Sequence, residues 1–204
     1  LSAAASLDAL QLPALREPLG LASAARLLGR FPLLRELRLH GACLACGPAC
    51  RAVAKTLPQL ALLEMRGNEL TGTGAATLAA QLEAAPATGA GALPLRALEL
   101  SGAALCSTKL AGQLAEEPAA ALRLVRALAG HAPRLVRLSL AGNCLKAAAA
   151  STIAAFLLGP SSCLLELGLE RNYLGDAGAT ALAHALTPKA ATAEAEAEAE
   201  GVPP

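Results

Sequence analysis

The chain has 204 residues, enough for one domain with a sizeable core or for several small repeats that share one. Apolar residues make up 54% of the chain and aromatic residues 1%, so we expect an aliphatic core of Leu and Ala. The net charge of +1 gives no global field to attract nucleic acid or an anionic membrane, and unpaired bases would find few aromatic side chains for stacking. We therefore expect no nucleic-acid partner.

The pattern LxxLxLxxNxL recurs along the chain and dominates the prediction. Five copies begin at Leu34, Leu60, Leu95, Leu135 and Leu164, and a weaker copy begins at Leu7. Leucines two residues apart face the same side of a strand, so each copy predicts a short strand followed by a turn. The starts are 26 to 40 residues apart, and the shorter spacings define the unit.

An amphipathic helix is predicted after several of these strands, over residues 71–82, 146–157 and 175–186. The first and third segments share Gly-Ala, then Leu-Ala, then a final Leu at the same offsets. Leu78 and Leu82 are four residues apart, as are Leu182 and Leu186, so both pairs are expected to pack onto the back of the sheet. Each unit is therefore predicted to be strand, turn and helix.

Asparagine occupies the ninth position of three copies, at Asn68, Asn143 and Asn172. Its amide both donates and accepts, so we expect it to satisfy backbone groups where the chain leaves each strand. Ala42 and Ala103 stand at this position in two other copies. Those two turns must find another partner, and some irregularity is expected there.

With both halves of the unit recurring, residues 7–186 resemble the ribonuclease-inhibitor-like class of leucine-rich repeats. The resemblance implies an α/β solenoid of about six repeats, with a curved parallel sheet on its concave face and helices on its convex face. We expect a leucine-rich-repeat domain over residues 1–188 and a low-complexity, solvated Ala/Glu tail over residues 189–204.

The two long spacings between repeats indicate insertions, over residues 86–94 and 111–122. Loops on solenoids often carry recognition, but long surface loops also cost little entropy and are tolerated without a function. We recognise no capping sequence at either end of the array, so we expect a longer repeat array or a partner that covers the ends.

His40, Cys43, Cys46 and Cys50 are the only cluster with metal-ligand residue types at short spacing. His40 is expected on the sheet and Cys50 at the start of a helix, so small packing residues are the better interpretation and we predict no metal site. The six Cys are expected to be reduced, because the aliphatic core needs no disulfides.

No nucleophile, base and orienting acid fall together, and neither Gly-rich segment has the phosphate-loop pattern, so we expect no catalytic residue, cofactor or small-molecule substrate.

The concave sheet face is the predicted binding surface, since its side chains are mostly charged or small. Charges of both signs suit a protein partner of complementary charge, and Arg is favoured at interface hot spots. The alternative is a solvated face without a partner. The candidate contact residues are Arg35, Arg38, His40, Glu64, Arg66, Arg96, Glu99, Arg137, Glu166 and Glu170.

The leading hypothesis is a non-catalytic interaction or scaffold module in a larger cytoplasmic or cytoskeletal assembly, such as a ciliary axoneme. Two alternatives rest on resemblance. The Ran GTPase-activating proteins have this repeat class and an acidic tail, which implies a regulator of a small GTPase; innate immune receptors carry similar sensor repeats.

No run of 18 apolar residues predicts a membrane span, and no basic segment precedes an apolar one at the start. We therefore expect neither a membrane anchor nor a signal peptide. We also expect that Leu1 is not the true start of the chain.

Overall fold

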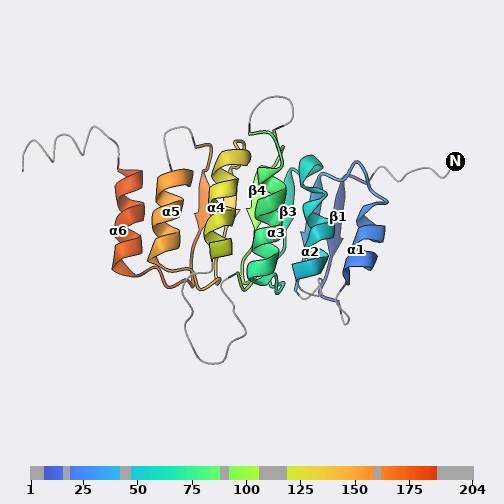
Figure 1. Ribbon diagram of the computed structural model, residues 1–204, viewed down its shortest axis with the longest axis horizontal. Helices are drawn as coiled ribbons and strands as arrows, with labels where there is room; N and C mark the ends of the chain where they lie inside the picture. Colours follow the sequence, from blue (N-terminus) through green and yellow to red (C-terminus); the bar gives the residue numbers. More distant parts are fainter. Residues whose placement is uncertain are drawn as a thin grey trace, which may run out of the picture.

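The computed structural model describes residues 7–15, 19–41, 47–87, 92–105, 119–158 and 162–187, and strand and helix alternate along them (Figure 1). The strands are β1 (Ala9–Leu12), β2 (Glu36–Leu39), β3 (Leu62–Glu64), β4 (Ala97–Glu99), β5 (Arg137–Ser139) and β6 (Glu166–Gly168). The helices are α1 (Leu21–Leu28), α2 (Gly47–Ala54), α3 (Thr71–Glu83), α4 (Ala119–His131), α5 (Ala147–Leu157) and α6 (Gly175–Leu186), with a short 3₁₀ helix, η1, at Leu57–Gln59.

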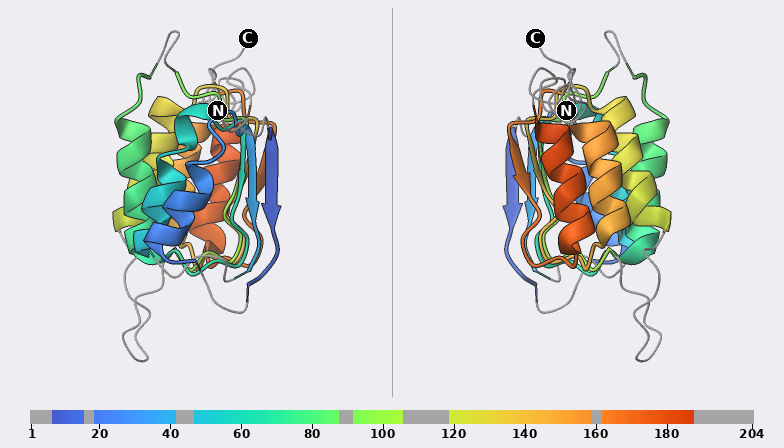
Figure 2. Two further views of the ribbon diagram at one scale, coloured as in Figure 1. Left: turned by 90° about the vertical axis from the view of Figure 1, so that its right-hand side faces the viewer. Right: turned by 90° about the vertical axis from the view of Figure 1, so that its left-hand side faces the viewer.

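The strands form one parallel sheet in the order β1-β2-β3-β4-β5-β6, so each strand pairs with its neighbours along the chain. The helices of the described residues all lie in a second layer on one side of this sheet (Figure 2). This arrangement confirms the predicted α/β leucine-rich-repeat solenoid of about six repeats, and the weak copy at Leu7 does form a strand, β1.

The core lies between the two layers and is built from leucines in register. Leu37 pairs with Leu63, Leu63 with Leu98, and Leu98 with Leu138, and these four are no more than 3% exposed. Full burial of a leucine contributes about 1.5–3 kcal/mol each, so this row and the parallel row through Leu39, Met65, Leu100 and Leu140 supply much of the stability.

The helices cover these rows with aliphatic side chains at helical spacing. Leu78 and Leu82 of α3 are both 1% exposed, as predicted. For the last helix the prediction was half wrong: Leu182 packs partly buried against the core, but Leu186 is 67% exposed. The structure describes no helix beyond α6, so α6 has a neighbour on one side only and its outer leucine faces solvent.

The asparagines connect consecutive units as predicted. Nδ2 of Asn68 donates to the Leu39 carbonyl at 2.8 Å, Nδ2 of Asn143 to Leu100 at 2.8 Å, and Nδ2 of Asn172 to Leu140 at 3.0 Å. Oδ1 of Asn143 accepts from the Leu105 N–H, and Oδ1 of Asn172 from the Leu145 N–H. Each amide therefore binds backbone of the preceding unit at the turn after the strand.

Ala103 has no amide, and the backbone takes over part of its role. The Leu70 N–H of the preceding unit, which corresponds to the Leu105 and Leu145 donors, donates to the Ala103 carbonyl at 3.0 Å and to the Asn68 carbonyl at 2.9 Å. The ladder of amides is thus interrupted, as expected, but this donor keeps its hydrogen bonds. Ala42 lies outside the described residues.

Other expectations fall partly or wholly outside the described residues, namely the insertion 86–94, most of the insertion 111–122, and the tail 189–204. The last four residues of the second insertion, 119–122, begin α4, so this part is helix rather than loop. In the described part of the chain, every helix is too short or too polar to cross a bilayer.

Candidate functional site

The outward side of the sheet, called the sheet face below, is formed by side chains that alternate with the buried leucines. Glu36, Leu62, Ala97, Arg137 and Glu166 are in register across the strands and form one row. Two residues further along, a second row contains Arg38, Glu64, Glu99, Ser139 and Gly168. A third set follows the strand ends, at His40, Arg66, Ser101, Ala141 and Glu170.

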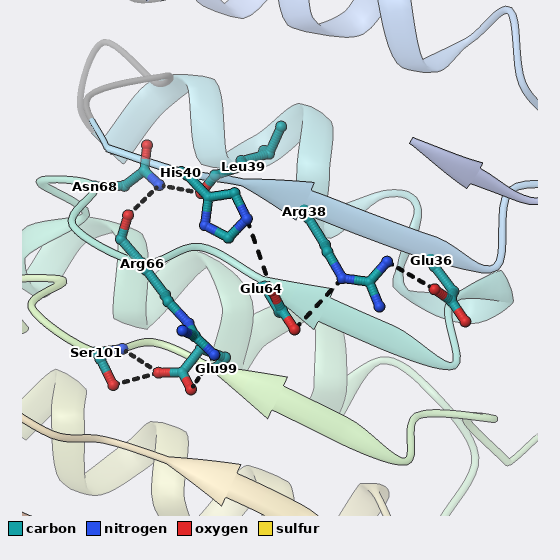
Figure 3. A network of polar contacts seen from close by, with 9 residues as sticks. All are labelled: Glu36, Arg38, Leu39, His40, Glu64, Arg66, Asn68, Glu99 and Ser101. Carbon is teal, nitrogen blue, oxygen red and sulfur yellow. Dashed lines mark hydrogen bonds and ion pairs between the residues drawn. The ribbon is translucent and has the colours of Figure 1, made fainter. Parts of the chain in front are cut away.

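The first polar network of the sheet face is centred on Glu64 (Figure 3). Nε of Arg38 lies 3.5 Å from Oε1 of Glu64, and Nε2 of His40 lies 3.8 Å from Oε2. Nη1 of Arg38 also donates to Oε2 of Glu36 at 2.8 Å. These neighbours shield the Glu64 carboxylate, so the Glu64 side chain is only 19% exposed. Solvent reaches mainly the side chains around it.

The second network is centred on Glu99, the register partner of Glu64. Nη2 of Arg66 lies 3.4 Å from Oε2 of Glu99, while Oε1 accepts from the Ser101 N–H at 3.0 Å and from the Ser101 hydroxyl. The Ser101 hydroxyl also lies 2.8 Å from the Ser139 hydroxyl on the next strand. Glu99 is 18% exposed, whereas Arg66 is 56% exposed and can be reached from solvent.

The β5 and β6 end of the sheet face is more open. Nε of Arg137 lies 3.9 Å from Oε2 of Glu166, and both side chains are more than half exposed, so this pair is weak and screened by salt. Gly168 leaves the end of β6 without a side chain; a Cβ there would come within 2.8 Å of the Ser139 hydroxyl. Gly168 therefore leaves space above the sheet between the charged side chains around it.

Two adjoining hollows lie on the sheet face, over the strands β3 to β6 and the turns that follow them. The first has a volume of about 480 Å³ and a floor that includes Leu62, Ala97 and Gly168. The second, of about 660 Å³, extends over the turns that follow β4 to β6 and reaches Glu170. Both are bordered by Arg66, Glu99 and Ser139, so they form one continuous depression with a partly apolar floor and charged walls of both signs.

Eight of the ten predicted contact residues lie on the sheet face, namely Arg38, His40, Glu64, Arg66, Glu99, Arg137, Glu166 and Glu170. Arg35 and Arg96 are exposed, and each directly precedes its strand, so the alternation within the strand does not decide on which side its side chain lies. Their place in the binding surface stays a prediction. Ser101 and Ser139 were left out of the predicted set, although the same alternation indicates them.

A metal site gains no support from the described residues. These residues contain no group of three or more His, Cys, Asp or Glu that could hold a metal ion. Cys50 is a free, fully buried thiol whose pKa burial raises to about 12, so it stays protonated at neutral pH. Cys144 and Cys163 are free and exposed, while Cys43 and Cys46 lie outside the described residues.

Comparison with known proteins agrees with the repeat architecture. The family model described as Leucine Rich repeat matches residues 161–183, which include β6 and much of α6. No curated protein matches the chain in a sequence search. Together with the parallel sheet of strand-and-helix units, the match supports a repeat protein whose strands carry leucine at regular positions.

Proposed function

We propose that this leucine-rich-repeat chain is a non-catalytic interaction module that binds a protein partner on its sheet face, as a scaffold component of a larger cytoplasmic or cytoskeletal assembly. The observation that carries the proposal is the continuous depression on the sheet face, lined by charges of both signs.

The electrostatics of this face favour selection of a partner. Glu64 and Glu99 are shielded, and each has an arginine beside it, Arg38 and Arg66 respectively, so the strand register sets where charges of both signs lie. A pattern of both signs rejects partners with mismatched charges. The apolar floor at Leu62 and Ala97 adds a place where a partner can bury apolar surface.

Exposed apolar residues at the β6 and α6 end support a place in an assembly. Leu165 is 82% exposed, Tyr173 is 64% exposed and Leu186 is 67% exposed. Large exposed apolar side chains in the last unit of a repeat array are typical of surfaces that another protein, or more of a longer chain, covers.

The test is a native pull-down from the protein's own source, quantified by mass spectrometry, with three versions of the chain. The wild type is compared with the sheet-face variant Arg66→Glu/Arg137→Glu and with the helix-layer control Arg126→Glu/Arg134→Glu, which changes net charge by the same amount. Arg66 and Arg137 are 56% and 59% exposed, so their replacement leaves the core intact.

The proposal expects a defined partner, in fixed ratio, that is recovered with the wild type and the control and lost with the sheet-face variant. Equal recovery by all three versions would contradict a role of the sheet face. Recovery of a small GTPase whose GTP hydrolysis the chain accelerates would replace the scaffold proposal by a regulatory one.

A further inference from the structure

The helix layer carries a strong excess of positive charge, in contrast to the balanced sheet face. The described segments 19–34, 47–60, 71–87 and 119–134, which hold α1 to α4 and the turns after them, contain seven Arg or Lys residues and one acidic residue, Glu83. All seven cations are exposed: Arg26, Arg30, Arg51, Lys55, Arg123, Arg126 and Arg134. Glu83 forms a hydrogen-bonded ion pair with Arg123, so it does not neutralise the others.

Two grooves run beside α2 within this basic layer, and Figure 1 shows α2 between α1 and α3. The larger groove, about 450 Å³, lies between α2 and α3 and is lined by Arg51 and Lys55 on one side and by Thr73, Thr77 and Gln81 on the other. The smaller, about 270 Å³, lies between α1 and α2, and Lys55 lines it too. Arg51 of α2 and Lys55, which directly follows the last residue of that helix, both line the larger groove, so they form one ridge of positive charge beside it.

Small residues make up part of the lining of both grooves, and Leu28 and Pro32 also line the smaller one. Ala54, Ala76 and Ala80 line the larger groove, and Ala25, Gly29 and Ala52 line the smaller one. Small residues between neighbouring helices leave space for a polypeptide backbone to approach. None of the residues that line either groove is acidic.

We propose that the grooves beside α2 bind an extended acidic peptide segment of a partner protein, as a second binding surface on the side of the molecule opposite the sheet face. Carboxylates of the peptide pair with Arg51 and Lys55, and Gln81 offers an amide to its backbone. The inference rests on the helix layer alone and does not depend on the proposed function of the sheet face.

A nucleic acid is the competing anionic ligand, and the groove chemistry favours the peptide. The residues that line the two grooves include no aromatic side chain on which a base could stack. They include only two cations, whereas nucleic-acid affinity grows with the number of neutralised phosphates.

The experiment measures fluorescence polarisation of labelled probes with the purified full chain at low salt. The probes are a peptide of alternating Glu and Ala, its counterpart with Gln in place of Glu, and an oligothymidylate. The variant Arg51→Gln/Lys55→Gln is compared with the control Arg126→Gln/Arg134→Gln, which loses the same charge but no residue that lines either groove. Circular dichroism verifies that both variants fold; both replace exposed side chains by another good helix former.

The expected result is that the Glu peptide binds at least about tenfold more tightly than the Gln peptide, that the Arg51/Lys55 variant loses about tenfold in affinity, and that the control changes by less than about twofold. Binding should weaken at high salt. Four results would overturn the proposal: absence of binding, equal binding of both peptides, equal loss in both variants, or tighter binding of the oligothymidylate with loss in the Arg51/Lys55 variant. None of them bears on partner capture by the sheet face, so the two proposals can fail separately.

Discussion

Replacing Asn143 by Ala tests whether the amides between consecutive units stabilise the solenoid. Asn143 is 1% exposed; its Nδ2 donates to the carbonyls of Leu100 at 2.8 Å and Leu140 at 3.0 Å, and its Oδ1 accepts from the Leu105 N–H at 3.3 Å. The asparagine thus connects the turn after β5 to the turn after β4.

The cost of Asn143→Ala follows from which groups keep a partner. The Leu100 carbonyl still accepts from the Ala103 N–H at 3.3 Å, and the Leu140 carbonyl still accepts from Nδ2 of Asn172 at 3.0 Å. The Leu105 N–H loses its partner at a residue that is 1% exposed. A buried donor without a partner costs about 1–3 kcal/mol and the lost net hydrogen bonding about 1 kcal/mol more, so we expect a loss of about 2–4 kcal/mol. That is a large share of the roughly 5–15 kcal/mol typical of a folded domain.

Urea unfolding followed by circular dichroism measures this loss, and hydrogen exchange of the Leu105 amide reports the orphaned group directly. Asn172→Ala is the comparison, because the Asn172 side chain is only half-buried and water can replace part of its bonding; a loss of about 1–2 kcal/mol is expected. A loss below about 0.5 kcal/mol in Asn143→Ala, with an unchanged denaturant slope, would refute the reasoning. It would mean that the turn closes on backbone groups alone, as the Leu70 N–H does at Ala103.

Three further predictions follow from other parts of the molecule. Iodoacetamide should label Cys144 and Cys163 in the native chain but Cys50 only after unfolding. Burial raises the pKa of Cys50 from 9.0 to about 12, so only the unfolded thiol ionises just above pH 9.0. The free energy of unfolding should therefore fall as pH rises above 9.0. Prompt native labelling of Cys50 would contradict its burial. Arg123→Ala should raise the pKa of Glu83 towards its ordinary value, since the hydrogen bond from Arg123 lowers it; carboxyl NMR titration measures this, and an unchanged pKa would exclude the pair in solution. The stabilisation that the ion pair of Arg123 and Glu83 contributes should be present above the pKa of Glu83 in the unfolded chain, and it should be lost as pH falls through the pKa of Glu83 in the folded chain. Gly102→Ala should cost about 1–2 kcal/mol, because φ at this turn is +63°; thermal unfolding would show it, and an unchanged midpoint would argue against a left-handed turn.

Local patterns in the sequence were sufficient to predict the units and much of the sheet face. The alternation LxL identified Leu37, Leu63, Leu98 and Leu138 as core residues, because a strand turns every second side chain to the same side. The same alternation placed Glu64, Arg66 and Glu99 on the opposite side. Arg35 and Arg96 precede their strands, so this alternation does not place their side chains.

Side-chain contacts between neighbouring units could not be predicted. The repeat pattern places Glu64 and Glu99 at the same position and so indicates their register, but no pattern in the sequence indicates that Arg66 reaches the Glu99 carboxylate. The basic ridge of Arg51 and Lys55 likewise gains its grooves only when α2 packs between α1 and α3.

Burial at the end of the array was also decided by tertiary structure. Leu186 has the same helical spacing as Leu82, yet one is 67% exposed and the other 1%, because burial depends on a neighbouring helix and not on the residue itself. Periodicity in the sequence determines which side of each element is apolar, since it is a property of a few consecutive residues. What covers that side, and which charges meet across it, is determined by the packing of units that lie far apart in the chain.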